Sequence, residues 1–321
     1  MAEHFVKAIS YPTIGIVLLG GISNKKTRTP RHTSAGIAYT NLDNNIKTET
    51  SLYEDTETHV RINGKESDDA SRSVMGSIEA YRNRILNRWG CKNISIDSTN
   101  YGILSGSSDS GAAALGKAVE SSIDSDIDLH DIENNMRAVS ESVGRSLFGG
   151  LTITWSDGYF AYTERILDES AFRDFLILGF SFDYKRNPSD VIHENIVKNE
   201  NYSKRIRKAE ERAHKIKELS RYSDIEGIFD IAEADTDDYH EILRDSGVNV
   251  IKENMGSLIE QLKQVRKVIW NRYIVTGGSN VYAVVKKYDY QQLLPFASKF
   301  GSTVSVLKVA GPALTVQKDT L

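Results

Sequence analysis

The chain has 321 residues, of which 40% are hydrophobic and 26% charged, a composition typical of a folded soluble protein rather than of a disordered or fibrous one. Its formal net charge of -4 gives no electrostatic reason to expect a nucleic acid as a partner. No apolar run is long enough to span a bilayer, no secretory signal opens the chain, and the single Cys91 excludes an internal disulfide, so we expect a cytoplasmic protein without membrane contact.

The first part of the chain predicts β structure around one amphipathic helix. The β-branched and apolar run at residues 11–21 predicts a buried strand, and the polar, basic stretch 22–33 predicts a surface loop. Short β patterns follow, separated by turn residues, and we expect them to form an antiparallel set: residues 34–39, 46–53 and 59–62. Apolar residues at helical spacing then predict a helix over residues 71–89, closed by Gly90.

The stretch 100–117, NYGILSGSSDSGAAALGK, has the features of a phosphate-binding loop. Its small and hydroxyl residues let a ligand approach the backbone, and the alanine-rich run behind them predicts a helix whose N–H groups and positive dipole end point at the same place. Taken alone, the stretch fits an ordinary side-chain N-cap equally well. The residues expected to meet phosphate are Ser105, Gly106, Ser107, Ser108, Ser110 and Gly111.

The second part of the chain predicts mainly helices, with strands at either side of them. We expect a helix at residues 131–147, a strand-turn-strand unit at 151–162 and a strand at 176–182. Charged helical patterns fill residues 189–267, with breaks near 222–224 and 246–247. The chain should end with strands at 273–276, 281–286 and 303–309 and a helix at 290–300. The expectation is an α+β protein of two domains, residues 1–184 and 185–321.

Three segments, in this order and spacing, resemble the GHMP small-molecule kinases and, within them, the diphosphomevalonate decarboxylase branch. Residues 103–114, ILSGSSDSGAAA, resemble the serine-rich second motif of that family. Residues 140–150, SESVGRSLFGG, resemble its arginine-bearing substrate segment, and residues 275–282, VTGGSNVY, its glycine-rich third motif. The resemblance spans the chain and implies an N-terminal domain like domain 2 of ribosomal protein S5, a ferredoxin-like C-terminal domain, and a cleft between them for ATP and substrate.

The chain departs from the decarboxylases at three positions. The resemblance implies a lysine where Leu18 stands and an aspartate where Thr276 stands, and Glu141 replaces a small residue beside the substrate. This combination is similar to the archaeal mevalonate 3-kinases, and the similarity extends through residues 28–39 and 184–197. It implies an ATP-dependent kinase of isoprenoid biosynthesis that phosphorylates the tertiary 3-hydroxyl of (R)-mevalonate without decarboxylation.

Phosphoryl transfer requires positioning and neutralisation of charge more than a strong base, so the catalytic residues are sought among the cations. Arg186 follows a buried strand at the domain junction and resembles the Arg or Lys that assists transfer in this family, although a surface ion pair is the alternative. Lys185 is the weaker candidate, because neighbours on an extended chain point in opposite directions. Arg145, with Ser146 beside it, is expected to bind the mevalonate carboxylate; compensation of the helix dipole is its simpler explanation from the residues alone.

Glu141 lies four residues before Arg145, so on a helix the two would share a face and form a salt bridge. The other interpretation is selectivity, since a carboxylate accepts a hydrogen bond from a free 5-hydroxyl and repels a 5-diphosphate. Leu18 and Thr276 complete the expected substrate pocket.

The expected cofactors are ATP and Mg²⁺, with the metal ion bridging the phosphates through few protein ligands. The sequence assigns no metal ligand. Four histidines show no metal-binding spacing and are interpreted as structural or exposed: His32, His130, His193 and His240. The expected partners are mevalonate and a second copy of the chain, as a homodimer.

Two rival functions stay open at this point. One is a decarboxylase of a phosphorylated mevalonate, against which Leu18 and Thr276 argue. The other is a regulator that binds a small molecule without catalysis, against which Arg186, Arg145 and the serine loop argue.

Overall fold

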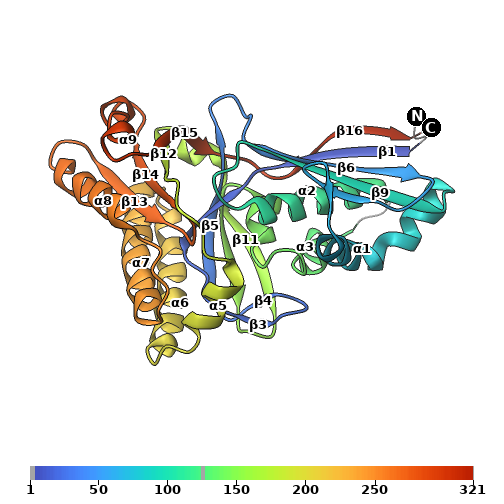
Figure 1. Cartoon of the computed structure of the whole chain (residues 1–321), viewed down its shortest axis with the longest axis horizontal. Coiled ribbons are helices and arrows are strands. Elements are labelled where there is room, and N and C mark those ends of the chain that lie inside the picture. The colour runs from blue at the N-terminus through green and yellow to red at the C-terminus, as the bar shows by residue number, and fades with distance from the viewer. Residues whose placement is uncertain (1–3, 124–126, 321) are drawn as a thin grey trace.

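The computed structural model describes residues 4–123 and 127–320. The molecule is elongated, and its first and last strands lie side by side at one tip (Figure 1). The sheet at that tip contains, in spatial order, β16 (Leu314–Thr320), β1 (His4–Ser10), β6 (Lys47–Asp55), β9 (Asn93–Tyr101), β7 (Val60–Ile62) and β8 (Lys65–Glu66). A second sheet contains β11 (Ala161–Leu167), β10 (Leu151–Ser156), β5 (Ser34–Asn41), β15 (Thr303–Val309), β12 (Phe175–Ser181), β14 (Asn280–Lys286) and β13 (Asn271–Val275), with β2 (Thr13–Val17) paired to β5.

Helices and a small hairpin complete the described structure. The helices are α1 (Asp68–Trp89), α2 (Ser107–Ser122), α3 (Leu129–Met136), α4 (Val143–Phe148), α5 (Ser189–Ile196), α6 (Tyr202–Ser220), α7 (Ile225–Asp245), α8 (Glu253–Val265) and α9 (Phe296–Lys299), with 3-10 turns η1 (Glu169–Phe172) and η2 (Tyr290–Gln292). The hairpin pairs β3 (Ile22–Asn24) with β4 (Thr29–Pro30). No helix in the described ranges is long and apolar enough to cross a membrane.

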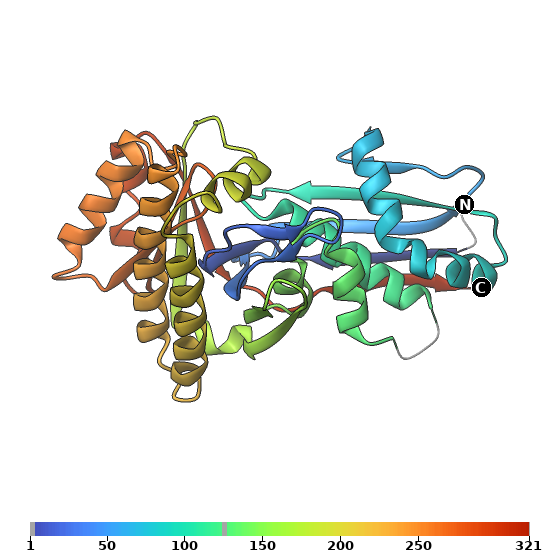
Figure 2. The same cartoon turned by 90° about the horizontal axis from the view of Figure 1, so that it is seen from below.

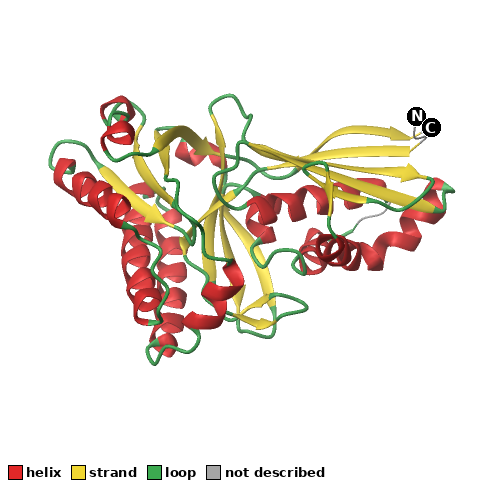
Figure 3. Ribbon diagram, viewed as in Figure 1, coloured by secondary structure: helices red, strands yellow, loops and turns green. Residues whose placement is uncertain are grey.

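Helices pack against both sheets (Figure 3), and alternate residues of the strands of the second sheet are buried in two separate cores, one on each face. At the tip, α2 packs on β1, β6 and β9, and α1 and α3 pack against α2, with Leu52, Ile96 and Ile78 in the shared core. The small side chains of Ala113 and Ala114 let α2 lie close to the sheet. At the other end, α6 and α7 run side by side against the second sheet (Figure 2). The region where the two ends meet is therefore flanked by rigid packing on both sides.

Much of the predicted secondary structure is confirmed. α1 ends at Trp89 and is capped by Gly90, whose φ of 65° lies in the left-handed region that glycine adopts at no steric cost. The phosphate loop leads into α2, the predicted turn joins β10 to β11, and the charged region contains α6, α7 and α8 with breaks at the predicted positions. The strands at 176–182, 273–276, 281–286 and 303–309 correspond to β12, β13, β14 and β15.

The predicted antiparallel set is wrong. β5 belongs to the second sheet, β6 to the sheet at the tip, and β7 pairs in parallel with β9. Local alternation predicts a strand but carries no information on which distant strand pairs with it. β1, β9 and β16 were not predicted, because polar residues interrupt their apolar alternation. The expected loop at 22–33 contains the hairpin of β3 and β4, and the helix expected at 290–300 is reduced to η2 and α9.

The single helix predicted at residues 131–147 is also wrong. α3 ends at Met136 and α4 begins at Val143, so Glu141 lies in the connection between the two helices rather than on a helix with Arg145. The i,i+4 salt bridge that the spacing suggested is therefore not formed, and Glu141 pairs elsewhere.

Candidate active site

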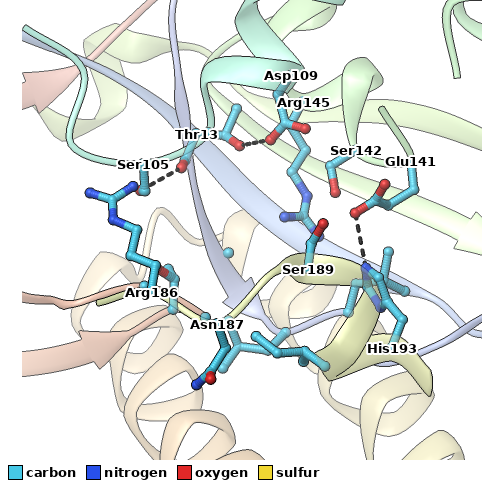
Figure 4. A pocket seen from close by; sticks show the side chains of 18 of the residues that line it. Thr13, Ser105, Asp109, Glu141, Ser142, Arg145, Arg186, Asn187, Ser189 and His193 are labelled. Atoms are coloured by element: carbon cyan, nitrogen blue, oxygen red, sulfur yellow. Dashed lines mark hydrogen bonds and ion pairs between the residues drawn. The ribbon is translucent and has the colours of Figure 1, made fainter. Parts of the chain in front are cut away.

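A cavity of about 250 Å³ lies where β2 ends, α2 begins and α5 starts (Figure 4). Its polar and charged lining comes from both sides of the molecule: Thr13, Ser105, Asp109, Glu141, Ser142, Arg145, Arg186, Asn187, Ser189, His193, Tyr239 and Thr276. The sequence-predicted residues Leu18, Gly106, Glu141, Arg145, Arg186 and Thr276 thus meet in one place.

The start of α2 is open toward this cavity. Its N-cap is Gly106, with a φ of 78°, and no side chain caps the helix, so the ordinary N-cap interpretation of the serines is wrong. A Cβ at Gly106 would lie 2.6 Å from the Thr13 backbone nitrogen, so only glycine fits between the loop and β2. The first-turn N–H groups keep their capacity to bind an anion, which the helix dipole favours.

Two buried tyrosines hold the loop before α2. The Tyr39 hydroxyl accepts from the Ser105 backbone N–H at 2.9 Å and donates to the Ser105 carbonyl at 2.8 Å. The Tyr282 hydroxyl lies 2.5 Å from the Ser105 Oγ. Burial raises the pKa of both phenols, so both stay protonated. The loop is therefore fixed in place rather than shaped by a ligand.

A second cavity, also about 250 Å³, lies on the other side of the α2 start. Ser107, Ser108 and Gly111 line it together with apolar side chains of the tip sheet, α1 and α2, among them Val60, Ile62, Val74, Ile96 and Leu115. Such a lining suits a flat apolar group joined to an anion that sits at the helix start. Sequence reasoning did not predict this cavity, because its walls come from six separate segments: β6, β7, α1, β9, α2 and the α3–α4 connection.

Three of the predicted site residues line neither cavity: Ser110, Ser146 and Lys185. Ser110 is fully buried, and its hydroxyl lies 2.6 Å from the Thr48 hydroxyl. The Ser146 hydroxyl donates to the Tyr11 carbonyl at 2.7 Å, which ties α4 to the segment before β2. The Ser110 hydroxyl thus joins α2 to β6, and the Ser146 hydroxyl joins α4 to the segment between β1 and β2.

Arg145 is 5% exposed and lines the main cavity. One terminal nitrogen donates to the Ser34 hydroxyl at 2.8 Å, while its Nε has no hydrogen-bond partner among the described residues. Space for the guanidinium comes from Gly36, where a Cβ would lie 2.5 Å from the arginine Cδ. Burial outweighs the nearby carboxylates of Asp109 and Glu141 and lowers its pKa, yet a guanidinium remains charged. A buried cation with unused donors suits an anionic ligand.

Glu141 is held at both carboxylate oxygens. Oε1 accepts from His193 Nε2 at 3.0 Å (Figure 4), and Oε2 accepts from Arg28 Nε at 2.8 Å. Burial opposes ionisation of Glu141, but the hydrogen bond from His193 and the charge of Arg28 outweigh it and hold the pKa well below its usual range. Sequence reasoning missed both partners and left His193 as a structural or exposed residue.

Arg186 lines the cavity, and its guanidinium donates to the Leu104 carbonyl at the phosphate loop. It therefore links the chain after β12 to the start of α2. Lys185 is exposed and does not line the cavity, as expected for neighbours on an extended segment.

The segment 18–21 after β2 is irregular, yet side chains satisfy nearly all of its backbone. Leu18 donates its N–H to Asp235 at 2.7 Å and accepts at its carbonyl from Arg205, and these two residues form a fully buried ion pair. The Gly20 N–H donates to His32 Nε2 at 3.1 Å, and the Gly21 N–H donates to His193 Nδ1 at 3.0 Å. The Leu18 side chain is thereby fixed at the cavity wall.

Asp109 is a lining residue that sequence reasoning missed. It occupies the first turn of α2, and its carboxylate accepts hydrogen bonds from the hydroxyls of Thr13 and Ser140. Burial raises its pKa against the lowering effect of the Arg145 charge and of these hydroxyls. A cation at this point would therefore stabilise the ionised form.

Comparison with known families defines the class of protein. Residues 10–163 match the diphosphomevalonate decarboxylase-like N-terminal domain, and residues 187–291 match the mevalonate-3-kinase C-terminal domain. Together with the site, these matches define a GHMP-type small-molecule kinase of α+β fold, as predicted.

Two relatives that match along nearly the whole chain identify the family within this class. The mevalonate 3-kinase of Thermoplasma acidophilum is 54% identical over 313 residues, covering 98% of each chain, and the mevalonate-3-kinase of Picrophilus torridus is 46% identical over 99% of this chain and 100% of the relative. The crystal structure of the T. acidophilum enzyme with mevalonate 3-phosphate and ADP bound matches with a TM-score of 0.95 and 52% identity, covering 98% of this chain and 99% of that one. The chain belongs to the mevalonate 3-kinase family.

Proposed function

We propose that this chain transfers the γ-phosphoryl group of ATP to the 3-hydroxyl of (R)-mevalonate, giving ADP and 3-phosphomevalonate with its carboxylate intact. One observation carries the proposal: a cavity with Arg145, Glu141 and Arg186 beside an uncapped helix start, in a chain that is 54% identical over 98% of its length to a mevalonate 3-kinase. The T. acidophilum structure holds both products of such a reaction. The product would serve isoprenoid biosynthesis.

The two ends of mevalonate differ in charge, and the cavity offers a partner for each. Arg145 binds the carboxylate through its unused donors. Glu141 accepts a hydrogen bond from the 5-hydroxyl and repels a 5-diphosphate. Thr276 Oγ1 is buried without a hydrogen-bond partner in the described structure, so it is available to the middle of the substrate.

The nucleotide occupies the α2 start and the second cavity. Gly106, Ser107 and Ser108 contact the phosphates through backbone N–H groups and hydroxyls, and the apolar wall of the second cavity receives the base. Because the main cavity shares the α2 start, the terminal phosphate faces the mevalonate site.

In the transfer step, the 3-hydroxyl oxygen forms a bond to the γ-phosphorus while the bond to the leaving oxygen of ADP breaks, and the hydroxyl proton passes to an oxygen of the transferred phosphoryl group. The transition state is loose, so the enzyme acts mainly by holding the reactants and balancing charge. Arg186 stabilises the transferring group, because its guanidinium is anchored at the phosphate loop and lines the cavity.

The residues at the α2 start fit Mg²⁺, which takes one or two carboxylates beside substrate phosphates. Asp109 offers a buried carboxylate there, and Thr13 adds a hydroxyl. No three His, Cys, Asp or Glu side chains gather at one point in the described ranges. Asp109 and Thr13 would hold the ion that accompanies ATP, and that ion would neutralise phosphate charge.

The reaction stops at the phosphorylated product because the cavity lacks the charged pair that the decarboxylases carry. Leu18 contributes only apolar surface, and Thr276 contributes a neutral hydroxyl. Loss of carbon dioxide requires phosphate to leave a tertiary carbon, and neither side chain supplies a charge that drives this departure.

The test is to incubate the protein with ATP and carboxyl-labelled mevalonate and to follow ADP, product mass and gas together. We expect one ADP per mevalonate, a product heavier by one phosphoryl group, and full retention of the label. Stoichiometric release of labelled carbon dioxide would identify a decarboxylase instead, and binding without turnover would identify a regulator.

The wider organisation is proposed as well. A division into residues 1–184 and 185–321 agrees with the two domain matches, although β16 of the second part pairs with β1 of the first. We also infer a cytoplasmic homodimer. Light scattering across a range of protein concentrations tests the dimer.

A further inference from the structure

The selectivity residue Glu141 belongs to a ring of residues that is joined by polar contacts and closes through the backbone of α5. Arg28, in the turn of the β3–β4 hairpin, donates from Nε to Glu141 and from a terminal nitrogen to Asp190 at 3.1 Å. Asp190 and His193 both lie on α5, and His193 donates to the other oxygen of Glu141. The ring therefore joins the hairpin, the α3–α4 connection and α5.

The proton positions in this ring are fixed by its contacts. The Gly21 N–H donates to His193 Nδ1, so this nitrogen accepts and the ring proton resides on Nε2, which faces Glu141. A Cβ at Gly21 would lie 2.6 Å from Val197, so glycine is required for the close approach of this backbone to the end of α5. His193 is thus a donor to Glu141 whose own position is fixed by the main chain.

Arg28 adopts a backbone conformation that a bulky side chain rarely takes. Its φ is 49°, in the left-handed region, which costs a non-glycine residue about 1 kcal/mol or more. The other non-glycine residues with positive φ in the described ranges are two asparagines and a serine. The arginine does not line the main cavity, although its partner Glu141 does. Arg28 therefore influences ligand binding in that cavity through its contact with Glu141.

We propose that Arg28 and His193 are positioning residues that set substrate specificity by fixing the Glu141 carboxylate at the cavity wall. The proposal rests on the mevalonate 3-kinase function proposed above. Arg28 occupies one oxygen of Glu141 from outside the cavity lining, and His193 occupies the other from the lining itself, so lone pairs on both oxygens remain for a ligand in the cavity. A carboxylate held this way presents its acceptor without losing side-chain entropy on binding, and it cannot swing aside to admit a larger anion.

The first test compares two hairpin variants that each remove one positive charge. Arg28→Gln breaks the ring, whereas Lys26→Gln changes an exposed lysine in the same turn that is not part of the ring. We expect Arg28→Gln to raise KM for mevalonate about tenfold, because the substitution removes a charge-assisted hydrogen bond to Glu141. The KM for ATP should stay unchanged and kcat should change less than about threefold. Lys26→Gln should match the parent.

A double-mutant cycle shows whether Arg28 acts through Glu141. In a Glu141→Gln background, Arg28→Gln should change KM for mevalonate by less than about twofold, because the carboxylate it positions is gone. If the fold-changes in KM for mevalonate caused by the two substitutions multiply in the double variant, Arg28 acts independently of Glu141 and the proposal is overturned. Equal kinetics of Arg28→Gln and Lys26→Gln would overturn it as well.

Two substitutions separate the contacts of His193. His193→Gln retains a donor near the Nε2 position, and His193→Asn retains an acceptor near the Nδ1 position that binds the Gly21 N–H. We expect KM for mevalonate near the parent value for His193→Gln and about tenfold higher for His193→Asn. If KM for mevalonate is equal in the two variants, or higher in His193→Gln, the Nε2 contact does not position Glu141 and the role proposed for His193 is overturned.

Activity of the parent enzyme on mevalonate distinguishes a wrong role for the ring from a wrong proposed function. If the parent enzyme does not phosphorylate mevalonate, the proposed function is wrong. An active parent whose ring variants keep its KM and its preference for mevalonate over the 5-diphosphate removes only the role of the ring.

Discussion

Protonation of His32 should destabilise the fold and the segment that carries Leu18. His32 is 1% exposed, its Nε2 accepts from the Gly20 N–H, and its Nδ1 donates to the Thr33 carbonyl at 2.7 Å. Burial, aided by the Arg205 charge, lowers its pKa to about 4, although Asp235 and the backbone contacts oppose the shift. A proton on Nε2 would face the Gly20 N–H and break that contact.

The size of the effect follows from the pKa shift. Between the ordinary value of 6.5 and about 4, the unfolded chain binds a proton at this histidine and the folded chain does not. The contribution of neutral His32 to the free energy of unfolding is therefore fully present above pH 6.5 and is lost as the pH falls toward 4. From about pH 7 to about pH 5, the loss is about 2 kcal/mol.

The assay is urea unfolding at these two pH values for the parent and for His32→Gln. Because His240, whose pKa is also lowered to about 4 by burial, is present in both proteins, its contribution cancels. We expect the parent to lose about 2 kcal/mol more than the variant on acidification, whatever the variant's stability at neutral pH. Equal losses in the two proteins would refute the reasoning.

Three further predictions concern the proposed site. Ser107→Leu places bulk at the α2 start and should weaken ATP binding by well over tenfold with the fold intact; an unchanged titration would refute the phosphate assignment. Arg186→Met should lower turnover at least about 100-fold with little change in ATP affinity, and surviving turnover would assign the role to another cation. Glu141→Gly should relax discrimination between mevalonate and its 5-diphosphate, which competition kinetics measure; an unchanged preference would exclude Glu141 as the selectivity residue.

The parts of the site that the sequence predicts are those encoded in short segments. The small residues before an alanine-rich run predict the phosphate loop and α2, and the structure places Gly106 where only glycine fits. Motif resemblance identifies Arg145, Arg186 and Leu18, and all three line one cavity.

The parts that sequence reasoning missed depend on contacts between distant segments. Local spacing pointed from Glu141 to Arg145, but the helix breaks between α3 and α4, and the partner Arg28 lies 113 residues away. Ser110 and Ser146 carry the residue type expected at a ligand site, but their hydroxyls are used between structural elements. Composition alone cannot tell a hydroxyl that binds a ligand from one that binds a strand.

The location of charge around Leu18 explains how an apolar residue can stand where the resemblance to decarboxylases implies a lysine. A buried cation is present near this position, but it is Arg205, which lies behind the backbone and contacts the Leu18 carbonyl. Its negative partner Asp235 receives the Leu18 N–H, so the pair is satisfied within the protein. Breaking such a buried pair is strongly destabilising, because it leaves an uncompensated charge. Arg205 and Asp235 thus hold the Leu18 main chain and do not reach the cavity. The Leu18 side chain presents only apolar surface to the substrate, which suits phosphoryl transfer without elimination.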